Sequence, residues 1–86
     1  MAQSIYDEID DFTLDEIFYK TGTMLGDALS AEQDQYTAIG EPTIAKAYRD
    51  EEYRMIRDRR AGQQQDRSHK IKLINAWNIR RKALVA

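Results

Sequence analysis

Hydrophobic residues recur every three or four positions along much of this 86-residue chain, which is the spacing of one face of an α-helix. The clearest run begins after Thr13, and its apolar members are Leu14, Ile17, Phe18, Leu25, Ala28 and Leu29. Thr13 and Glu16 have the spacing of a capping box, so the pattern predicts a helix from Leu14 to Leu29. Gly22 and Gly26 lie one turn apart, which predicts close approach by another helix or an early end at Gly22.

Capping and turn residues predict two short helices and a turn that leads into a longer helix. Ser4 is an N-cap candidate for a short helix over residues 5–11. A second capping pattern at Ser30 and Gln33 predicts a short helix over residues 31–39. Gly40 suits the residue after a helix end and Pro42 suits the first position of the next helix, so an αα-hairpin is expected at Gly40–Pro42. The following helix should run from Pro42 to about Ala61.

The C-terminal stretch from Arg67 to Val85 is amphipathic. One of its faces carries Leu73, Ala76, Trp77, Arg80 and Leu84. The favoured interpretation is a helix that faces the core and keeps a solvated basic edge, with the methylenes of Arg80 along the apolar stripe. The alternative is a partner-binding face formed by Leu73, Trp77, Arg80 and Leu84, with Trp77 as the anchor.

Residues 62–66, GQQQD, allow two architectures. As a loop they let the C-terminal helix fold back into a compact bundle, which we favour. As helix they would join the last two segments into one rod. A helix starting after Ser68 would place His69 and Lys70 in its first turn, where positive charge opposes the helix dipole. Either an anion lies there, or the helix does not start there.

These patterns together predict an all-α fold: a small bundle of three to five helices with an αα-hairpin at Gly40–Pro42 and a long C-terminal helix or helix pair. Only one proline and four glycines interrupt the chain, in keeping with helices. We expect residues 1–86 to form a single helical domain. A domain of this size buries a modest core, so oligomerisation or a partner is a reasonable expectation.

Charge is strongly segregated along the chain. The N-terminal half, residues 1–40, carries nine acidic residues and one base, whereas the C-terminal half, residues 41–86, carries six acidic residues and twelve bases. The small net charge of −2 therefore hides an acidic half and a basic half. The opposite charges of the two halves can pair within one molecule, between copies of the chain, or with an external charged partner.

Several function classes find no support in the residues. No cysteine is available for a disulfide or thiolate site, and no apolar run reaches the roughly 20 residues that span a bilayer. The acidic N-terminus does not read as a signal peptide, so we expect a cytoplasmic location, or one within a viral particle, and no membrane association. His69 is the only histidine and has no predicted catalytic neighbour, so we expect no enzyme activity, metal or cofactor.

The leading hypothesis is a non-enzymatic protein-interaction module, either oligomeric or part of a larger assembly. In being short, cysteine-free and charge-segregated, the chain is similar to small phage-encoded structural or accessory proteins. The alternative is a nucleic-acid-binding protein that uses the basic C-terminal helices. Its candidate anion contacts are Arg57, Arg60, Arg67, His69, Lys70, Lys72 and Arg81.

Overall fold

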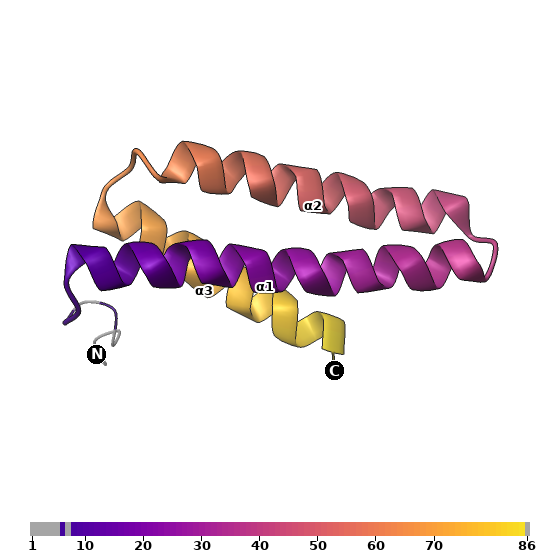
Figure 1. Ribbon diagram of the computed structural model, residues 1–86, viewed down its shortest axis with the longest axis horizontal. Coiled ribbons are helices and arrows are strands. Elements are labelled where there is room, and N and C mark those ends of the chain that lie inside the picture. Colours follow the sequence, from indigo (N-terminus) through magenta and orange to yellow (C-terminus); the bar gives the residue numbers. More distant parts are fainter. Residues whose placement is uncertain (1–5, 7, 86) are drawn as a thin grey trace.

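The computed structural model describes residue 6 and residues 8–85, and within them it contains three helices: α1 (Asp11–Ala38), α2 (Pro42–Gly62) and α3 (Arg67–Val85). α1 and α2 form an antiparallel hairpin, and α3 crosses behind α1 in the view of Figure 1. α1 is the central element because it packs against both other helices. The predicted all-α bundle is confirmed.

The start of α1 differs from the prediction. The side chain of Asp10 caps the helix, its Oδ1 accepting a hydrogen bond of 2.8 Å from the backbone N–H of Thr13. α1 therefore begins at Asp11, and the Thr13–Glu16 capping box is wrong. The helix predicted over residues 5–11 does not form as one element: Tyr6 has 3₁₀ geometry, residues 8–10 are not helical, and Asp11 belongs to α1. The predicted N-cap Ser4, with Ile5 and Asp7, lies outside the described residues.

The predicted helix boundary at Ser30 is wrong as well, since α1 continues to Ala38. The polar groups that resemble a capping pair contact another helix instead. Ser30 Oγ and Gln33 Nε2 both donate to Glu52 Oε1 of α2, at 3.3 and 2.7 Å. Because these side chains bind α2, they do not cap a new helix at Ser30, and α1 continues through this position.

The predicted turn between α1 and α2 is confirmed. Gly40 has a φ of +78°, a left-handed conformation that glycine adopts without strain. The N–H of Gly40 donates to the carbonyl of Thr37 at 3.2 Å, and the N–H of Glu41 donates to the carbonyl of Tyr36 at 2.8 Å. This pair of bonds is a Schellman motif, and Pro42 starts α2 directly after it.

The chain turns again between Gly62 and Arg67, so the compact arrangement is confirmed and the rod is wrong. Asp66 Oδ1 accepts a 3.0 Å hydrogen bond from the N–H of His69, which caps α3. Gly62 lies against the core at the end of α2: a Cβ added there would approach Phe18 Cζ to 2.8 Å. The α2 backbone can pass this close to the Phe18 ring only because residue 62 has no side chain.

The hydrophobic core lies mainly between α1 and α3. The rings of Phe18 and Trp77 meet with centroids 5.1 Å apart, and only 6% of Trp77 is exposed. The cluster of buried residues consists of Leu14, Phe18, Leu25, Leu29, Met55, Ile74 and Trp77. The prediction that the C-terminal helix faces the core is therefore confirmed.

The seam between α1 and α2 is built differently, from glycines. A Cβ added to Gly22 would lie 2.9 Å from Arg59 Cδ, and one added to Gly26 would lie 3.1 Å from Met55 Cε. The two glycines thus give α2 room to lie close to α1, as their one-turn spacing predicted. The early helix end considered at Gly22 does not occur.

Candidate functional site

The face of α3 that the sequence offered to a partner is occupied within the chain. Trp77 is buried, and Leu73 and Leu84 are half-buried against the core cluster. Arg80 Nε and one terminal nitrogen bind the two carboxylate oxygens of Glu51 on α2, at 2.7 and 2.9 Å. This carboxylate, against the opposing effect of partial burial, raises the pKa of the Arg80 guanidinium above its ordinary value. The face joins α3 to the other two helices.

Two of the predicted anion contacts already bind carboxylates of α1. Arg67 donates to Asp11 and to the backbone carbonyls of Tyr6 and Ile9, and Lys70 Nζ donates to Asp15 Oδ1 at 2.7 Å. These carboxylates are the anions that the basic first turn of α3 required. Charge segregation is thus partly satisfied inside one molecule.

The remaining predicted contacts are dispersed. His69 and Lys72 are exposed on α3, whereas Arg57 and Arg60 are exposed on α2. Arg81 is half-buried, and one of its terminal nitrogens donates to Asn78 Oδ1 at 3.1 Å, while its Nε lacks a hydrogen-bond partner. The structure does not gather the seven predicted residues into one basic site.

Another surface combines exposed aromatic side chains with charged side chains that form no ion pair with any described residue. One side of α1 belongs to it. Residues that follow one another at intervals of three, four, seven or eight share a side of a helix. In α1 this side carries Phe12, Glu16, Tyr19, Asp27 and Asp34, all exposed, and the exposed base Lys20 lies beside them. Phe12 is 73% and Tyr19 51% exposed. Glu16, Asp27 and Asp34 form no ion pair in the described part of the chain.

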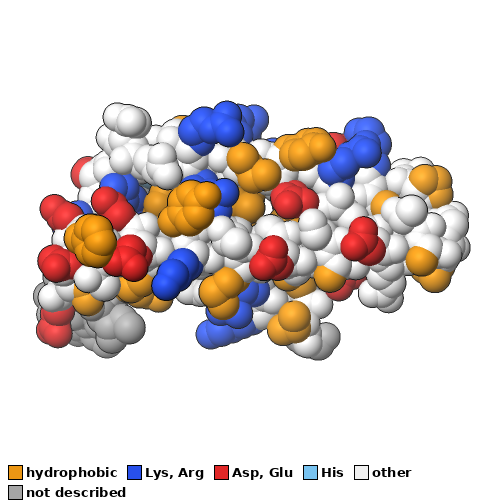
Figure 2. All heavy atoms as spheres, viewed as in Figure 1, with side chains coloured by type: hydrophobic (Ala, Val, Ile, Leu, Met, Phe, Trp, Pro, Cys, Tyr) orange, Lys and Arg blue, Asp and Glu red, His pale blue; other side chains and the backbone are white. Residues whose placement is uncertain are grey.

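The adjoining side of α2 carries Arg49, Tyr53, Ile56, Arg57 and Arg60. We call these five residues, together with the five on α1, the outer face. Figure 2 shows acidic side chains along α1, Lys and Arg side chains along the upper edge formed by α2, and hydrophobic side chains among them. Within the described residues, five charged residues of the outer face form no ion pair: the acids Glu16, Asp27 and Asp34 of α1, and the bases Arg49 and Arg60 of α2.

Contacts across the helix seam hold the outer face together. The guanidinium of Arg59 lies 4.1 Å from the ring centroid of Tyr19 and donates to Thr23 Oγ1 at 2.8 Å. Tyr19, Ile56 and Arg60 line a shallow groove beside this contact, and Tyr53, Ile56 and Arg60 line the next. The exposed aromatic rings therefore sit on rigid helices beside arginine side chains.

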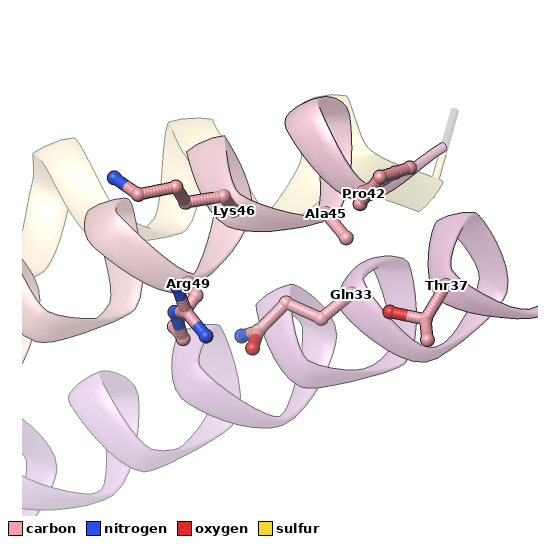
Figure 3. A pocket seen from close by; sticks show the side chains of 6 residues that line it. All are labelled: Gln33, Thr37, Pro42, Ala45, Lys46 and Arg49. Carbon is pink, nitrogen blue, oxygen red and sulfur yellow. The ribbon is translucent and has the colours of Figure 1, made fainter. Parts of the chain in front are cut away.

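A separate groove lies near the turn between α1 and α2. It is lined by Gln33, Thr37, Pro42, Ala45, Lys46 and Arg49. Figure 3 shows Arg49 and Gln33 directed toward each other across the groove, while Lys46 extends along α2 away from α1. Lys46 Nζ binds Asp50 Oδ2 at 2.9 Å, so its charge is already partly matched.

Phe12 and Tyr19 were not predicted as members of this surface. The signal that was available is the spacing of Phe12, Glu16 and Tyr19, which lie opposite the Leu14–Phe18–Leu25 stripe of the same helix. Hydrophobic periodicity identifies the buried stripe of a helix but not the aromatic residues on its opposite side.

Among residues 6 and 8–85, no three His, Asp or Glu side chains lie together in a way that would hold a metal ion. Within the same residues, none of the three helices has the length and apolarity that crossing a membrane requires. No protein-family model, curated protein or solved structure matches this chain.

Proposed function

We propose that this protein is a non-enzymatic helical interaction module that acts by associating with protein, as an oligomer or as a component of a larger assembly. The single observation that carries the proposal is the outer face, where Tyr19 and Tyr53 stay exposed beside Arg57 and Arg60. Tyrosine and arginine are among the residues that contribute most to binding at protein interfaces. Their backbone is fixed by the α1–α2 seam, so little ordering would be needed on binding.

The experiment that tests association is light scattering after size-exclusion chromatography, from micromolar to millimolar protein, at low and high salt. Tyr53→Ser is the test variant because 60% of Tyr53 is exposed on the outer face. Ile79→Ser is the matched control because 72% of Ile79 is exposed, but on α3. Circular dichroism checks that both variants keep the helical fold.

We expect a defined oligomer whose dissociation constant rises about tenfold in Tyr53→Ser, the size of a 1.4 kcal/mol contact, and stays unchanged in Ile79→Ser. A chain that remains monomeric at millimolar concentration would contradict the proposal. Equal weakening by both variants would show that the outer face is not the surface responsible.

The second candidate is nucleic-acid binding, and one observation favours it: α3 contains six Lys and Arg residues and no acidic residue. The expected ligand is the phosphate backbone, with Tyr53 available for base stacking. The test is fluorescence anisotropy with a labelled single-stranded oligonucleotide at several salt concentrations. Nucleic-acid binding would be supported if affinity falls steeply as salt rises and if this salt dependence is weaker in Lys72→Ala. Absence of binding at low salt would exclude it.

A further inference from the structure

The free charges on the outer face are arranged in two parallel rows, one mainly acidic and one basic. The row on α1 consists of Glu16, Asp27 and Asp34, with the exposed base Lys20 beside it, and the row on α2 consists of Arg49, Arg57 and Arg60. Only Arg57 in these rows has an ion pair, with its neighbour Asp58 at 3.6 Å. A surface with one acidic row and one basic row can match a second copy of itself if the rows exchange places.

We propose that the outer face binds a second copy of this chain, through a two-fold axis parallel to α1 and α2, so that α1 of each protomer lies on α2 of its partner. In the dimer, α1 and α2 of one copy face α2 and α1 of the other, and α3 of each copy lies on the side away from the interface. This inference rests on the proposed function and names its partner and geometry. A two-fold interface requires a self-complementary surface, which the two rows provide.

Charge selects this axis over its alternative. A two-fold axis lying in the outer face but perpendicular to the helices would set α1 on α1 and α2 on α2. Acidic residues would then face acidic residues, and arginines would face arginines, which like-charge juxtaposition disfavours. The axis parallel to the helices brings each acidic row against a basic row.

The same axis also fixes which residues meet, because rotation about it causes no displacement along the helices. Residues at one level of a protomer therefore stay at that level in the dimer. Contacts across the seam set these levels: Tyr19 lies at Arg59, and Gln33 and Thr37 line one groove with Ala45 and Arg49. Asp34 then falls near Arg49 of the second copy, and Glu16 falls within about a turn or two of Arg60 of the second copy.

The outer face has the size and composition that a dimer needs. The molecule measures 46 × 26 × 18 Å, and Figure 2 views it down the shortest axis. The viewed face is larger than the roughly 800 Å² per partner of a standard interface. Phe12, Tyr19 and Tyr53 supply exposed aromatic surface beside the charged residues. By contrast, exposed Ile79 lies on α3 among bases alone, so a two-fold contact there would set like charges together.

The test uses two charge-reversed forms of the full chain. One carries Glu16→Lys and Asp34→Lys, and the other carries Arg49→Glu and Arg60→Glu. All four residues are exposed and without an ion pair in the described structure, so the fold should tolerate the changes. The matched control reverses two exposed bases of α3, Lys72→Glu and Lys82→Glu.

We expect each reversed form to self-associate about tenfold or more weakly, because every altered pair occurs twice in a two-fold dimer. Mixing the two forms should restore a 1:1 heterodimer of nearly original affinity, measured by light scattering and by native mass spectrometry. The α3 control should associate like the original chain. Circular dichroism of each form confirms the fold.

Other outcomes overturn the dimer geometry. If both reversed forms still associate like the original chain, the rows do not form the interface, although association itself stands. If Glu16→Lys with Asp34→Lys strengthens self-association, the helices pair α1 on α1. If mixing fails to restore binding, the opposite rows do not meet. A chain that never associates would overturn the proposed function as well as the dimer geometry. Association that is insensitive to the charge reversals would overturn the geometry alone, so the two failures are distinguishable.

Discussion

α1 is bound on two sides by seams that hold the bundle together in different ways. Toward α3 the seam is made of large apolar side chains, with Phe18 against Trp77 and Ile74 fully buried. Toward α2 it is made by Gly22 and Gly26, which admit Met55 and Arg59 at close range. The comparison shows that one helix can be held on one side by burying large side chains and on the other by glycines that let a neighbouring helix approach closely. The two seams should therefore respond oppositely to a change of side-chain size.

Removing bulk should damage the α3 seam most. Trp77→Ala deletes a buried ring that contacts Phe18, and we expect a loss of about 3–5 kcal/mol in the free energy of unfolding. That is a large part of the stability of a domain this size. Urea denaturation followed by circular dichroism measures it, since the variant has no tryptophan. Ile79→Ala is the control, with an expected change within about 0.5 kcal/mol. A loss equal to that of the control would show that Trp77 contributes little.

Adding bulk should damage the α2 seam. Gly22→Val places a branched side chain where even a Cβ would be 2.9 Å from Arg59 Cδ, and we expect destabilisation by about 1–3 kcal/mol. Ala31→Val, at an exposed position of the same helix, controls for the helix propensity of valine. The measurement is the urea midpoint of both variants. Because valine forms helix more readily than glycine, a Gly22→Val variant as stable as the original chain would show that the close approach at Gly22 is not a tight constraint.

A smaller effect should follow from removing the polar contact in the α2 seam. Glu52→Ala deletes the acceptor shared by Ser30 and Gln33, and we expect a loss of about 0.5–1.5 kcal/mol. Glu52→Gln keeps an acceptor oxygen of similar reach and should lose less. Thermal unfolding of the two variants side by side distinguishes hydrogen bonding from helix packing. Equal losses would indicate that the charge of Glu52, rather than the acceptor, matters.

The smallest effect concerns pH at the start of α1. Hydrogen bonding to Thr13 lowers the pKa of Asp10, and Arg67 adds to this. A carboxyl whose pKa is lowered by folding stabilises the fold above its ordinary pKa near 3.8, and this contribution disappears as pH falls through the folded value. The urea midpoint of the original chain should thus fall in acid more than that of Asp10→Asn, which caps without titrating. Parallel curves would contradict this.

The sequence predicted features that depend on local chemistry. Gly40 and Pro42 specify the turn through their own backbone preferences, and the Leu73–Trp77 spacing specifies a core-facing helix. It could not decide between competing caps, because Asp10 and Thr13 are both suitable N-cap residues three positions apart.

Features that depend on distant contacts were missed. Ser30 and Gln33 form a local capping pattern, yet their polar groups bind Glu52 of another helix. Lys70 and Asp15 pair across 55 positions, which no periodicity predicts. The partner-binding alternative for the C-terminal helix was left open for a related reason: amphipathic spacing identified the Trp77 face but not the helix that covers it.

The short turn at Gly40 has a consequence for the order in which the molecule folds. α1 and α2 are joined by only three residues, so their hairpin closes with little loss of chain entropy. The contacts of α3 with α1 span separations such as the 55 positions between Asp15 and Lys70, and such contacts form slowly. The rings of Phe18 and Trp77 come together only in that late event. We therefore expect tryptophan fluorescence in a stopped-flow refolding experiment to lag behind the gain of helical circular dichroism, as the last helix docks onto a hairpin that already exists.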